Sequence, residues 1–447
     1  MGSLTTGLIR LGTALIPFAH VRKRVRRRLL DRARDAMIER TLPRVRARYA
    51  GHEARCASKL ARGERLGVCF LVSDVAQFSA EPVYLRMRGD PRFDAFIAVA
   101  PRVSRGEDFL RETQEKTLRV LTERYGEVLR LYDPETGRRA SLANRADIVF
   151  TSIVYRDQTL EEYTVESLSE FALVACIPYG YSGLFKSNVT RTVFLPEITL
   201  MWRYFFSNRP TLELWTGRNR HLADSARLSG YAKMDRLADV PVRTDRPKTV
   251  VIAPHHSLPR SGNAEGLTLS TFLIHSDLFL QLPREYPGVR FVFRPHPLLF
   301  PRLATDAWWG AARTQSYRAA MASLPNVEFQ QGGDYFETFA NSDALIHDCG
   351  SFLAEYFYTG RPQCYLLADR ETEEREFLPF GRRLLDHTYK AYDARAVREF
   401  LDRVVLGGDD PMKGARDALA ESDVRCFYPH AADRVVDAVV ESILGNK

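Results

Sequence analysis

Short apolar runs alternate with amphipathic stretches over most of the chain, and this alternation constrains the fold more than any other feature. Four apolar runs come first, and each is long enough for one buried strand: 67–72, 96–99, 148–153 and 172–177. Helix-like segments lie between them, at 81–88, 107–125 and 160–170. Buried strands that alternate with helices are typical of βαβ units around a parallel sheet.

A polar stretch with two prolines, residues 239–248, interrupts this pattern. A second series of apolar runs follows it, at 249–253, 289–293, 327–329, 344–347 and 363–367. The 447 residues are too many for one core, because a domain usually holds about 100–200 residues. We therefore expect an α/β fold with two doubly wound, Rossmann-like domains. Their expected bounds are 66–240 and 246–410, with a helical segment at 411–447.

The first 50 residues form a basic arm with 13 Lys and Arg against three Asp and Glu, whereas the other 397 residues carry a net charge of −2. A nucleic-acid-binding body would spread its positive charge over the folded part, so we expect no nucleic-acid partner. A basic run at 22–28 follows an apolar stripe of helical spacing, formed by Leu4, Leu8, Leu11, Leu15 and Phe18. Such a helix suits an anionic membrane surface. The alternative is a helix packed on the body, with solvated arginines.

Composition and motifs exclude several classes of protein. The six cysteines contain no C-x-x-C pair, which fits a reducing cytoplasm and argues against a disulfide framework or a zinc knuckle. No apolar run reaches the length of about 18–20 residues that a membrane-spanning helix needs. The chain has no G-x-G-x-x-G after a strand, no Walker loop and no H-E-x-x-H. We expect no bound metal and no required cofactor.

Polar side chains gather after the strands of the second series, at the sheet edge where doubly wound domains bind ligands. They are His255 and His256 after the first run, Arg294 and His296 after the second, and His347, Asp348, Gly350, Ser351 and Glu355 at the fourth. One histidine at a strand end is more often structural than catalytic. Three strand ends that converge on one edge favour a site.

The chemistry of these residues favours a nucleoside-diphosphate ligand. Gly350 and Ser351 begin a predicted helix, whose free N–H groups and dipole bind phosphate. Glu355 lies one turn further on, where its carboxylate can accept both hydroxyls of a ribose. Arg294 and His296 suit a diphosphate whose leaving oxygen must be stabilised. The residues thus predict a two-domain transferase with a nucleotide-diphosphate donor.

Several motifs carry a resemblance to a known family. The stretches VVIAPHHS, FVFRPHPLL and SDALIHDCGSFLAEYFYTGRP resemble the C-terminal half of the CDP-glycerol glycerophosphotransferase family, the bacterial teichoic-acid and capsule polyol-phosphate transferases with the GT-B fold. E-P-V-Y at 81–84, D-P-R-F-D at 90–94 and S-G-Y-A-K-M-D at 229–235 are also similar. The resemblance covers roughly residues 66–370.

This resemblance implies an enzyme that moves glycerol phosphate, or another polyol phosphate, from a CDP-linked donor to a lipid-linked or polymeric glycan, with release of CMP. It implies the GT-B fold and a peripheral place at the cytoplasmic face of the bacterial inner membrane. By similarity, His296 and the loop 348–351 bind the donor pyrophosphate.

One departure from the family concerns the catalytic base. Many members carry a His-Gly pair after the last strand of the first domain, with the histidine as the proposed base. Here the acceptor-side pair is Tyr179 and Gly180, and a tyrosine with a pKa near 10 is a poor base at neutral pH. We therefore look to His255 or His256 for the base. Asp74, after the first strand, is the alternative.

Two other functions stay open at this point. A GT-B glycosyltransferase with a nucleotide-sugar donor, acting in capsule or cell-wall polysaccharide synthesis, would share the fold, the phosphate site and the ribose carboxylate. A non-catalytic lipid-surface or assembly protein could keep the same cleft without turnover. The missing histidine favours this alternative slightly, whereas the four histidines at the strand ends argue against it. The donor that the protein accepts, a CDP-polyol or a nucleotide sugar, distinguishes the polyol-phosphate transferase from the glycosyltransferase.

Overall fold

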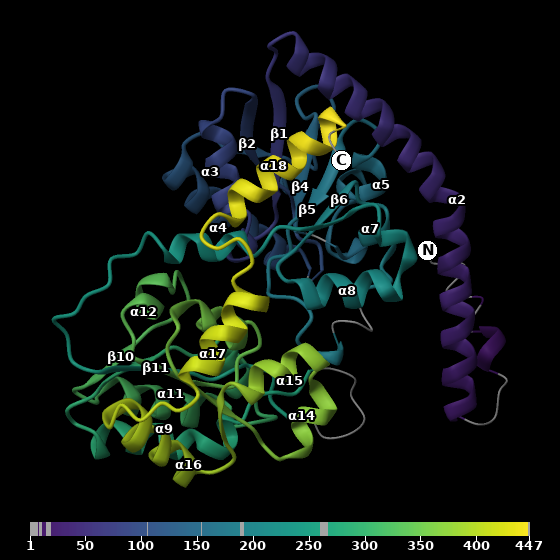
Figure 1. Cartoon of the computed structure of the whole chain (residues 1–447). Helices are drawn as coiled ribbons and strands as arrows, with labels where there is room; N and C mark the ends of the chain where they lie inside the picture. Colours follow the sequence, from purple (N-terminus) through teal and green to yellow (C-terminus); the bar gives the residue numbers. More distant parts are fainter. Residues whose placement is uncertain are drawn as a thin grey trace.

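The computed structural model describes residues 8, 11–14, 19–104, 106–152, 154–187, 192–259 and 267–445. Within these ranges the chain forms two parallel sheets, each flanked by helices (Figure 1). In both sheets the first strand of the domain lies inside, the next two strands extend to one side, and the later strands extend to the other. The expectation of two doubly wound α/β domains is therefore confirmed.

The first domain contains a seven-stranded sheet in the order β3-β2-β1-β4-β5-β6-β7. Its strands are β1 (Leu66–Val72), β2 (Phe93–Val99), β3 (Leu129–Arg130), β4 (Ile148–Thr151), β5 (Leu173–Cys176), β6 (Arg203–Phe206) and β7 (Ala226–Leu228). Its helices after β1 are α3 (Glu81–Gly89), α4 (Glu107–Tyr125), α5 (Val165–Leu168), α7 (Pro196–Thr199) and α8 (Arg209–Arg218).

The second domain contains a six-stranded sheet in the order β10-β9-β8-β11-β12-β13. Its strands are β8 (Thr249–Ala253), β9 (Arg290–Phe293), β10 (Val327–Phe329), β11 (Ala344–His347), β12 (Gln363–Leu366) and β13 (Tyr389–Ala391). Its helices are α9 (Phe272–Glu285), α10 (Leu299–Leu303), α11 (Gly310–Ala322), α12 (Phe336–Ala340), α13 (Phe352–Glu355), α14 (Glu371–Glu376), α15 (Pro379–Asp386), α16 (Ala394–Glu399) and α17 (Lys413–Leu419).

The sequence pattern predicts most of the inner strands and few of the outer ones. The inner strands β8 and β11 begin and end at the expected residues, and so do helix α4 and the edge strand β10, whereas the inner strand β6 was not predicted. Strands β3, β7 and β13 are two or three residues long and lie at sheet edges, with only partly buried side chains apart from Ala391 and the exposed Arg130. Such strands leave no continuous apolar run in the sequence, so they were not predicted.

Helix α2 (Ala19–Ala61) spans 43 residues and joins the basic arm to the first domain. From residue 38 onward, one face of this helix is buried in the core of that domain, through Ile38, Leu42, Val45, Tyr49 and Cys56. From residue 38 onward, α2 is thus a structural helix of the first domain. The expected arm over residues 1–50 takes in part of this buried helix, and the expected first domain, which begins at residue 66, leaves it out.

The first half of α2 runs past the edge of the first domain (Figure 1). Of the predicted apolar stripe, Leu8 and Leu11 are exposed, whereas Leu4, Leu15 and Phe18 lie outside the described residues. Among the described residues, no helix combines the length and the apolar character that crossing a membrane requires.

The last helix, α18 (Ala431–Leu444), returns from the second domain to the first (Figure 1). Val435 and Val439 are fully buried in the core of the first domain. Asp235 holds the start of α18, because its carboxylate accepts the backbone N–H groups of Ala431 (3.2 Å) and Ala432 (2.7 Å). The C-terminal helix therefore connects the two domains a second time.

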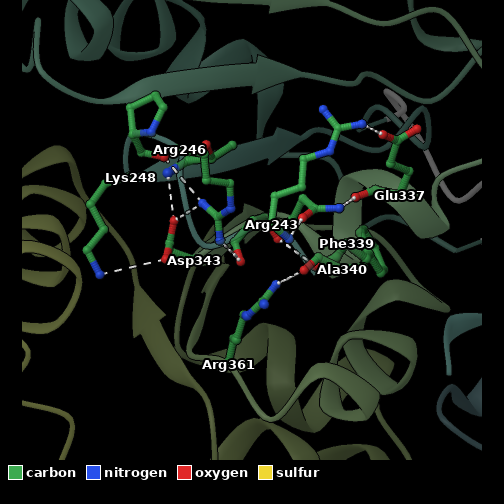
Figure 2. A network of polar contacts seen from close by, with 12 residues as sticks. Arg243, Arg246, Lys248, Glu337, Phe339, Ala340, Asp343 and Arg361 are labelled. Carbon is green, nitrogen blue, oxygen red and sulfur yellow. Dashed lines mark hydrogen bonds and ion pairs between the residues drawn. The ribbon is translucent and has the colours of Figure 1, made fainter. Parts of the chain in front are cut away.

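The linker between the sheets is fixed to the second domain by a network of charged side chains (Figure 2). Arg246 pairs with Asp343 just before β11, and Arg243 pairs with Glu337 on α12 at 2.7 Å. Arg361 donates to two backbone carbonyls at the end of α12. Further back along the chain, Tyr231, Met234 and Leu237 are already packed in the core of the second domain. The chain therefore crosses between the domains near Gly230.

Replacing Gly230 by alanine should destabilise the protein strongly. Gly230 has φ +80°, and an added Cβ would lie 1.9 Å from the carbonyl oxygen of Cys426. Gly63 is the matched control, because it has φ +73° but nothing within 4 Å of an added Cβ. We expect urea unfolding to show a loss of about 1 kcal/mol for Gly63→Ala and about 3 kcal/mol or more for Gly230→Ala. Equal losses would show that the contact with Cys426 does not matter.

Candidate functional site

Three histidines form a cluster at the carboxyl ends of β8 and β9. The ring centroids of His255 and His256 lie 4.3 Å apart, and those of His256 and His296 lie 3.9 Å apart in a stacked arrangement. One nitrogen from each ring lies within 4.8 Å of the others. The prediction that these strand ends converge is therefore confirmed for these three residues.

Hydrogen bonds assign the tautomers of two of these histidines. The Nδ1 atom of His255 accepts the backbone N–H of Ser257 at 3.3 Å and lies 2.7 Å from the hydroxyl oxygen of the same residue, whose O–H can also donate to it. Nδ1 of His296 accepts the backbone N–H of Leu298 at 3.1 Å. A neutral imidazole whose Nδ1 accepts a hydrogen bond carries its proton on Nε2. His255 and His296 therefore both offer an Nε2–H donor, the kind of group that binds a phosphate oxygen.

The surroundings keep these two histidines neutral. Burial lowers the pKa of His296 to about 4, and the positive charge of Arg302 acts in the same direction. The pKa of His255 lies well below its usual 6.5, again because of burial, with the neighbouring His256 and His296 and the charge of Arg302 adding to the effect. At pH 7 both rings are hydrogen-bond donors without a charge.

Arg302 brings a positive charge to the cluster, and the sequence analysis did not identify it. It lies on α10, and its guanidinium donates to the backbone carbonyl of His256 at 3.1 Å. The only signal in the sequence is one basic residue on the short helix that follows R-P-H-P. Arg302 can add its charge to the Nε2–H donors of the cluster.

Three clustered histidines could also hold a metal ion. A histidine that binds a metal through one nitrogen usually donates the N–H of its other nitrogen to a neighbour. Here Nδ1 of His255 and Nδ1 of His296 instead accept backbone N–H groups. This donor set therefore fits an anion better than a metal.

Asp348 is fully buried at the end of β11, beneath the cluster. One carboxylate oxygen accepts the backbone N–H of His255, and the other accepts the N–H and the hydroxyl of Thr271 at 2.6 and 2.9 Å. Burial raises the pKa of Asp348 to about 7. Asp348 thus holds the loop after β8 against the start of α9, and in this structure it acts on the site through the backbone of His255.

Two other residues predicted to bind the donor also make their contacts inside the second domain. His347 is fully buried, and its Nε2 donates to the Gln363 side chain (2.9 Å) while its Nδ1 accepts the N–H of Cys349 (3.2 Å). Burial lowers its pKa to about 3. Arg294 is buried and donates to Gln330 and to the carbonyl of Gly333. Both side chains shape the loops, and a direct contact with a donor remains a prediction for them.

Ser351 lies where the two domains meet. Its hydroxyl accepts the backbone N–H of Tyr181 at 3.4 Å, and a Cβ added to Gly180 would lie 3.4 Å from the same oxygen. Tyr179 and Gly180 follow β5, so the predicted acceptor loop and the predicted phosphate loop are in contact. Helix α13 begins right after Ser351, as expected, although it is short and continues as the 3-10 turn η6 (Tyr356–Thr359).

Glu355, the predicted ribose ligand, is buried, and its partners come from the second domain and from the segment where the chain crosses between the domains. Its Oε2 accepts the hydroxyl of Tyr335 at 2.6 Å. Its Oε1 accepts the hydroxyl of Tyr231 at 3.3 Å and lies 3.5 Å from the Lys233 ammonium. Tyr231 and Lys233 belong to the motif S-G-Y-A-K-M-D, so the structure shows what this motif contacts.

Asp74 follows β1 in the first domain, as predicted. It accepts the N–H of Ala76 at 3.0 Å and pairs with Arg102 at 3.2 Å. Nearby, a small surface hollow lies at the carboxyl ends of β1 and β4, lined by residues that include Val72, Gln77, Phe78, Phe150, Thr151 and Ser152. This hollow lies on the side predicted for the acceptor.

Comparison with known proteins identifies the fold. No family model and no curated protein match the chain. Among solved structures, it is similar to a histidine-to-asparagine variant of the wall teichoic acid polymerase TagF, with 14% identity, a TM-score of 0.56, and coverage of 86% of this chain and 90% of that one. A second TagF structure, soaked with CDPG, has 13% identity and a TM-score of 0.53, and the match covers 92% of this chain and 98% of that one.

The chain is also similar to the UDP-GlcNAc 2-epimerase of Neisseria meningitidis bound to UDP-GlcNAc. That match has 13% identity and a TM-score of 0.53, and it covers 84% of this chain and 100% of the epimerase. At such identities the likeness concerns the fold, which is GT-B, as the family resemblance implied.

The buried carboxylate of Asp348 gives a test by pH. The pKa of Asp348 is about 7 in the folded protein, whereas an ordinary aspartate has a pKa of about 3.8. The folded state therefore binds this proton more tightly than the unfolded chain. The stability that the proton contributes is full below about pH 4 and is lost as the pH rises through 7. In urea unfolding, the advantage of the wild type over Asp348→Asn should therefore be larger at pH 5 than at pH 7.5. An advantage that grows with pH would show that the three hydrogen bonds outweigh burial.

Proposed function

We propose that this protein is a transferase that moves glycerol phosphate, or another polyol phosphate, from a CDP-linked donor to a lipid-linked or polymeric cell-surface glycan, with release of CMP. The observation that carries the proposal is the contact of Ser351, at the predicted phosphate loop, with the loop of Tyr179 and Gly180. The GT-B fold that the chain shares with TagF supports it.

In the proposed mechanism, the donor diphosphate binds to the Nε2–H groups of His255 and His296. The oxygen of an acceptor hydroxyl attacks the distal phosphorus, and the bond from this phosphorus to the oxygen of CMP breaks. The charge that develops on CMP is stabilised by the two histidines and by Arg302. Positioning and electrostatics account for most of the rate in such phosphoryl transfers.

The proton of the acceptor hydroxyl needs a base, and we assign this role to His256. His255 and His296 carry their proton on Nε2 and so act as donors toward the diphosphate. Asp74 is engaged with Arg102 and with the N–H of Ala76. His256 stacks on His296 within the cluster, so its ring would lie beside a diphosphate that binds there.

His256→Gln should lower turnover by about 10²- to 10⁴-fold, the usual contribution of a general base, while CDP affinity is kept. His255→Gln is the comparison, and it should act mainly by weakening CDP binding. Turnover is measured as CMP release from CDP-glycerol with a lipid-linked glycan, and affinity by calorimetry. If His256→Gln keeps near-normal turnover while Asp74→Asn is inactive, the base belongs to the first domain.

A second candidate function uses a nucleotide sugar, and the likeness to an epimerase bound to UDP-GlcNAc favours it. The two candidates differ in the donor and in the bond that breaks. A panel of CDP-glycerol, CDP-ribitol, UDP-GlcNAc and UDP-glucose, each tested for turnover, separates them. Turnover with CDP-polyols alone supports the proposal, whereas turnover with UDP-sugars alone replaces it by the second candidate.

We also propose that the basic arm attaches the enzyme to the inner leaflet of the bacterial membrane, where a lipid-linked acceptor would lie. The exposed Leu8 and Leu11, and the exposed Arg28 and Arg32 on the first half of α2, are the described residues that suit an anionic lipid surface. Each Lys or Arg near such a surface contributes about 1 kcal/mol.

Deletion of residues 1–37 should abolish sedimentation with anionic liposomes and leave CDP affinity unchanged. The cut precedes Ile38 because the helix is buried in the first domain from there on. In the full chain, Arg28→Glu with Arg32→Glu should weaken liposome binding by about tenfold or more. Arg395→Glu is the control, since Arg395 is exposed on the other domain. A truncated protein that still sediments with the vesicles would show that the arm is not the anchor.

A further inference from the structure

Tyr231 shares one hydroxyl hydrogen between two acceptors. Its oxygen lies 3.1 Å from the backbone carbonyl oxygen of Tyr179 and 3.3 Å from Oε1 of Glu355. A phenol has a single O–H, so it can donate fully to only one of them at a time. Burial of the ring raises the pKa of Tyr231 well above its usual value, so the hydroxyl keeps its hydrogen.

The two acceptors belong to different parts of the proposed reaction. Tyr179 lies in the loop after β5, which also contacts Ser351 and faces the acceptor side. Glu355 lies on α13, where a donor ribose is expected. The ring of Tyr231 is held between them, packed edge-on against Tyr181 with centroids 5.4 Å apart.

The Glu355 carboxylate has little capacity left for a ribose. A carboxylate accepts about four hydrogen bonds, two on each oxygen; Oε1 already faces Tyr231 and Lys233, and Oε2 accepts Tyr335. One position on Oε2 is left, so a ribose that offers both of its hydroxyls must place the second on Oε1 and replace Tyr231 or Lys233 there. Tyr231 can leave at the lower cost, because the carbonyl of Tyr179 is already within hydrogen-bond distance.

We propose that Tyr231 couples the donor site to the acceptor loop: a bound donor ribose takes over Glu355, and the Tyr231 hydroxyl then donates fully to the Tyr179 carbonyl and fixes that loop. The coupling rests on the proposed function, because it needs a nucleotide at Glu355. It makes Tyr231 a positioning residue, and it predicts that the donor binds before the acceptor.

Hydrogen exchange followed by mass spectrometry tests this coupling, with CDP as the probe. In the wild type, saturating CDP should slow exchange in the segment 178–182 by about 2- to 10-fold, the effect of one hydrogen bond. In Tyr231→Phe, CDP should still bind, but this protection should be absent. Tyr335→Phe is the matched control, because Tyr335 also donates to Glu355 but, within the described part of the chain, makes no hydrogen bond to the loop, so saturating CDP should still protect 178–182.

The outcomes distinguish the coupling from the function on which it rests. If calorimetry shows that CDP binds the wild type and exchange in 178–182 does not change, the coupling is wrong and the donor site stands. If Tyr231→Phe keeps the full protection, the hydroxyl is not the link and the coupling is also wrong. If CDP does not bind the wild type even at millimolar concentration, both proposals fall together. Thermal unfolding of Tyr231→Phe and Tyr335→Phe checks that both variants are folded.

Discussion

The arrangement of the candidate site depends on one buried carboxylate, that of Asp348. It sits at the end of an inner strand, β11, and accepts hydrogen bonds from His255 and Thr271, which follow another inner strand and precede α9. A buried carboxylate is costly unless its hydrogen bonds are satisfied, so the donors around it are strongly constrained. The backbone of His255, and with it the position of the histidine cluster, follows from this constraint.

A second dependence lies in the short segment where the chain crosses between the domains. Tyr231 and Lys233 reach Glu355 near the proposed donor site, and Asp235 holds the start of α18. Residues 231, 233 and 235 of one short segment thus both contact the candidate site and join the two domains. Because the linker beyond them is fixed to the second domain through Arg246 and Asp343, movement between the domains would bend the chain near Gly230.

The sequence predicted the described inner strands other than β6, because strands buried on both faces leave continuous apolar runs, and β6 begins with a charged residue, Arg203. It also predicted which loops contribute to the site, since the carboxyl ends of parallel strands lie at one edge. It did not predict which side chains turn inward. His347 and Arg294 are engaged inside the second domain, and their partners Gln363 and Gln330 lie 16 and 36 residues away in the chain.

By itself, therefore, the sequence determined two doubly wound domains, the strand ends that carry the polar residues, and the excess of positive charge in the arm, because burial and charge are written in residue type and spacing. The tertiary structure decided the rest. The tautomers of His255 and His296, the approach of Arg302 and the position of Tyr231 between Tyr179 and Glu355 all depend on distances between side chains and backbone groups. The histidine and Arg302 contacts form only once the loops of the second domain are folded, and the Tyr231 contacts only once segments from both domains are packed together. No periodicity in the chain records these distances.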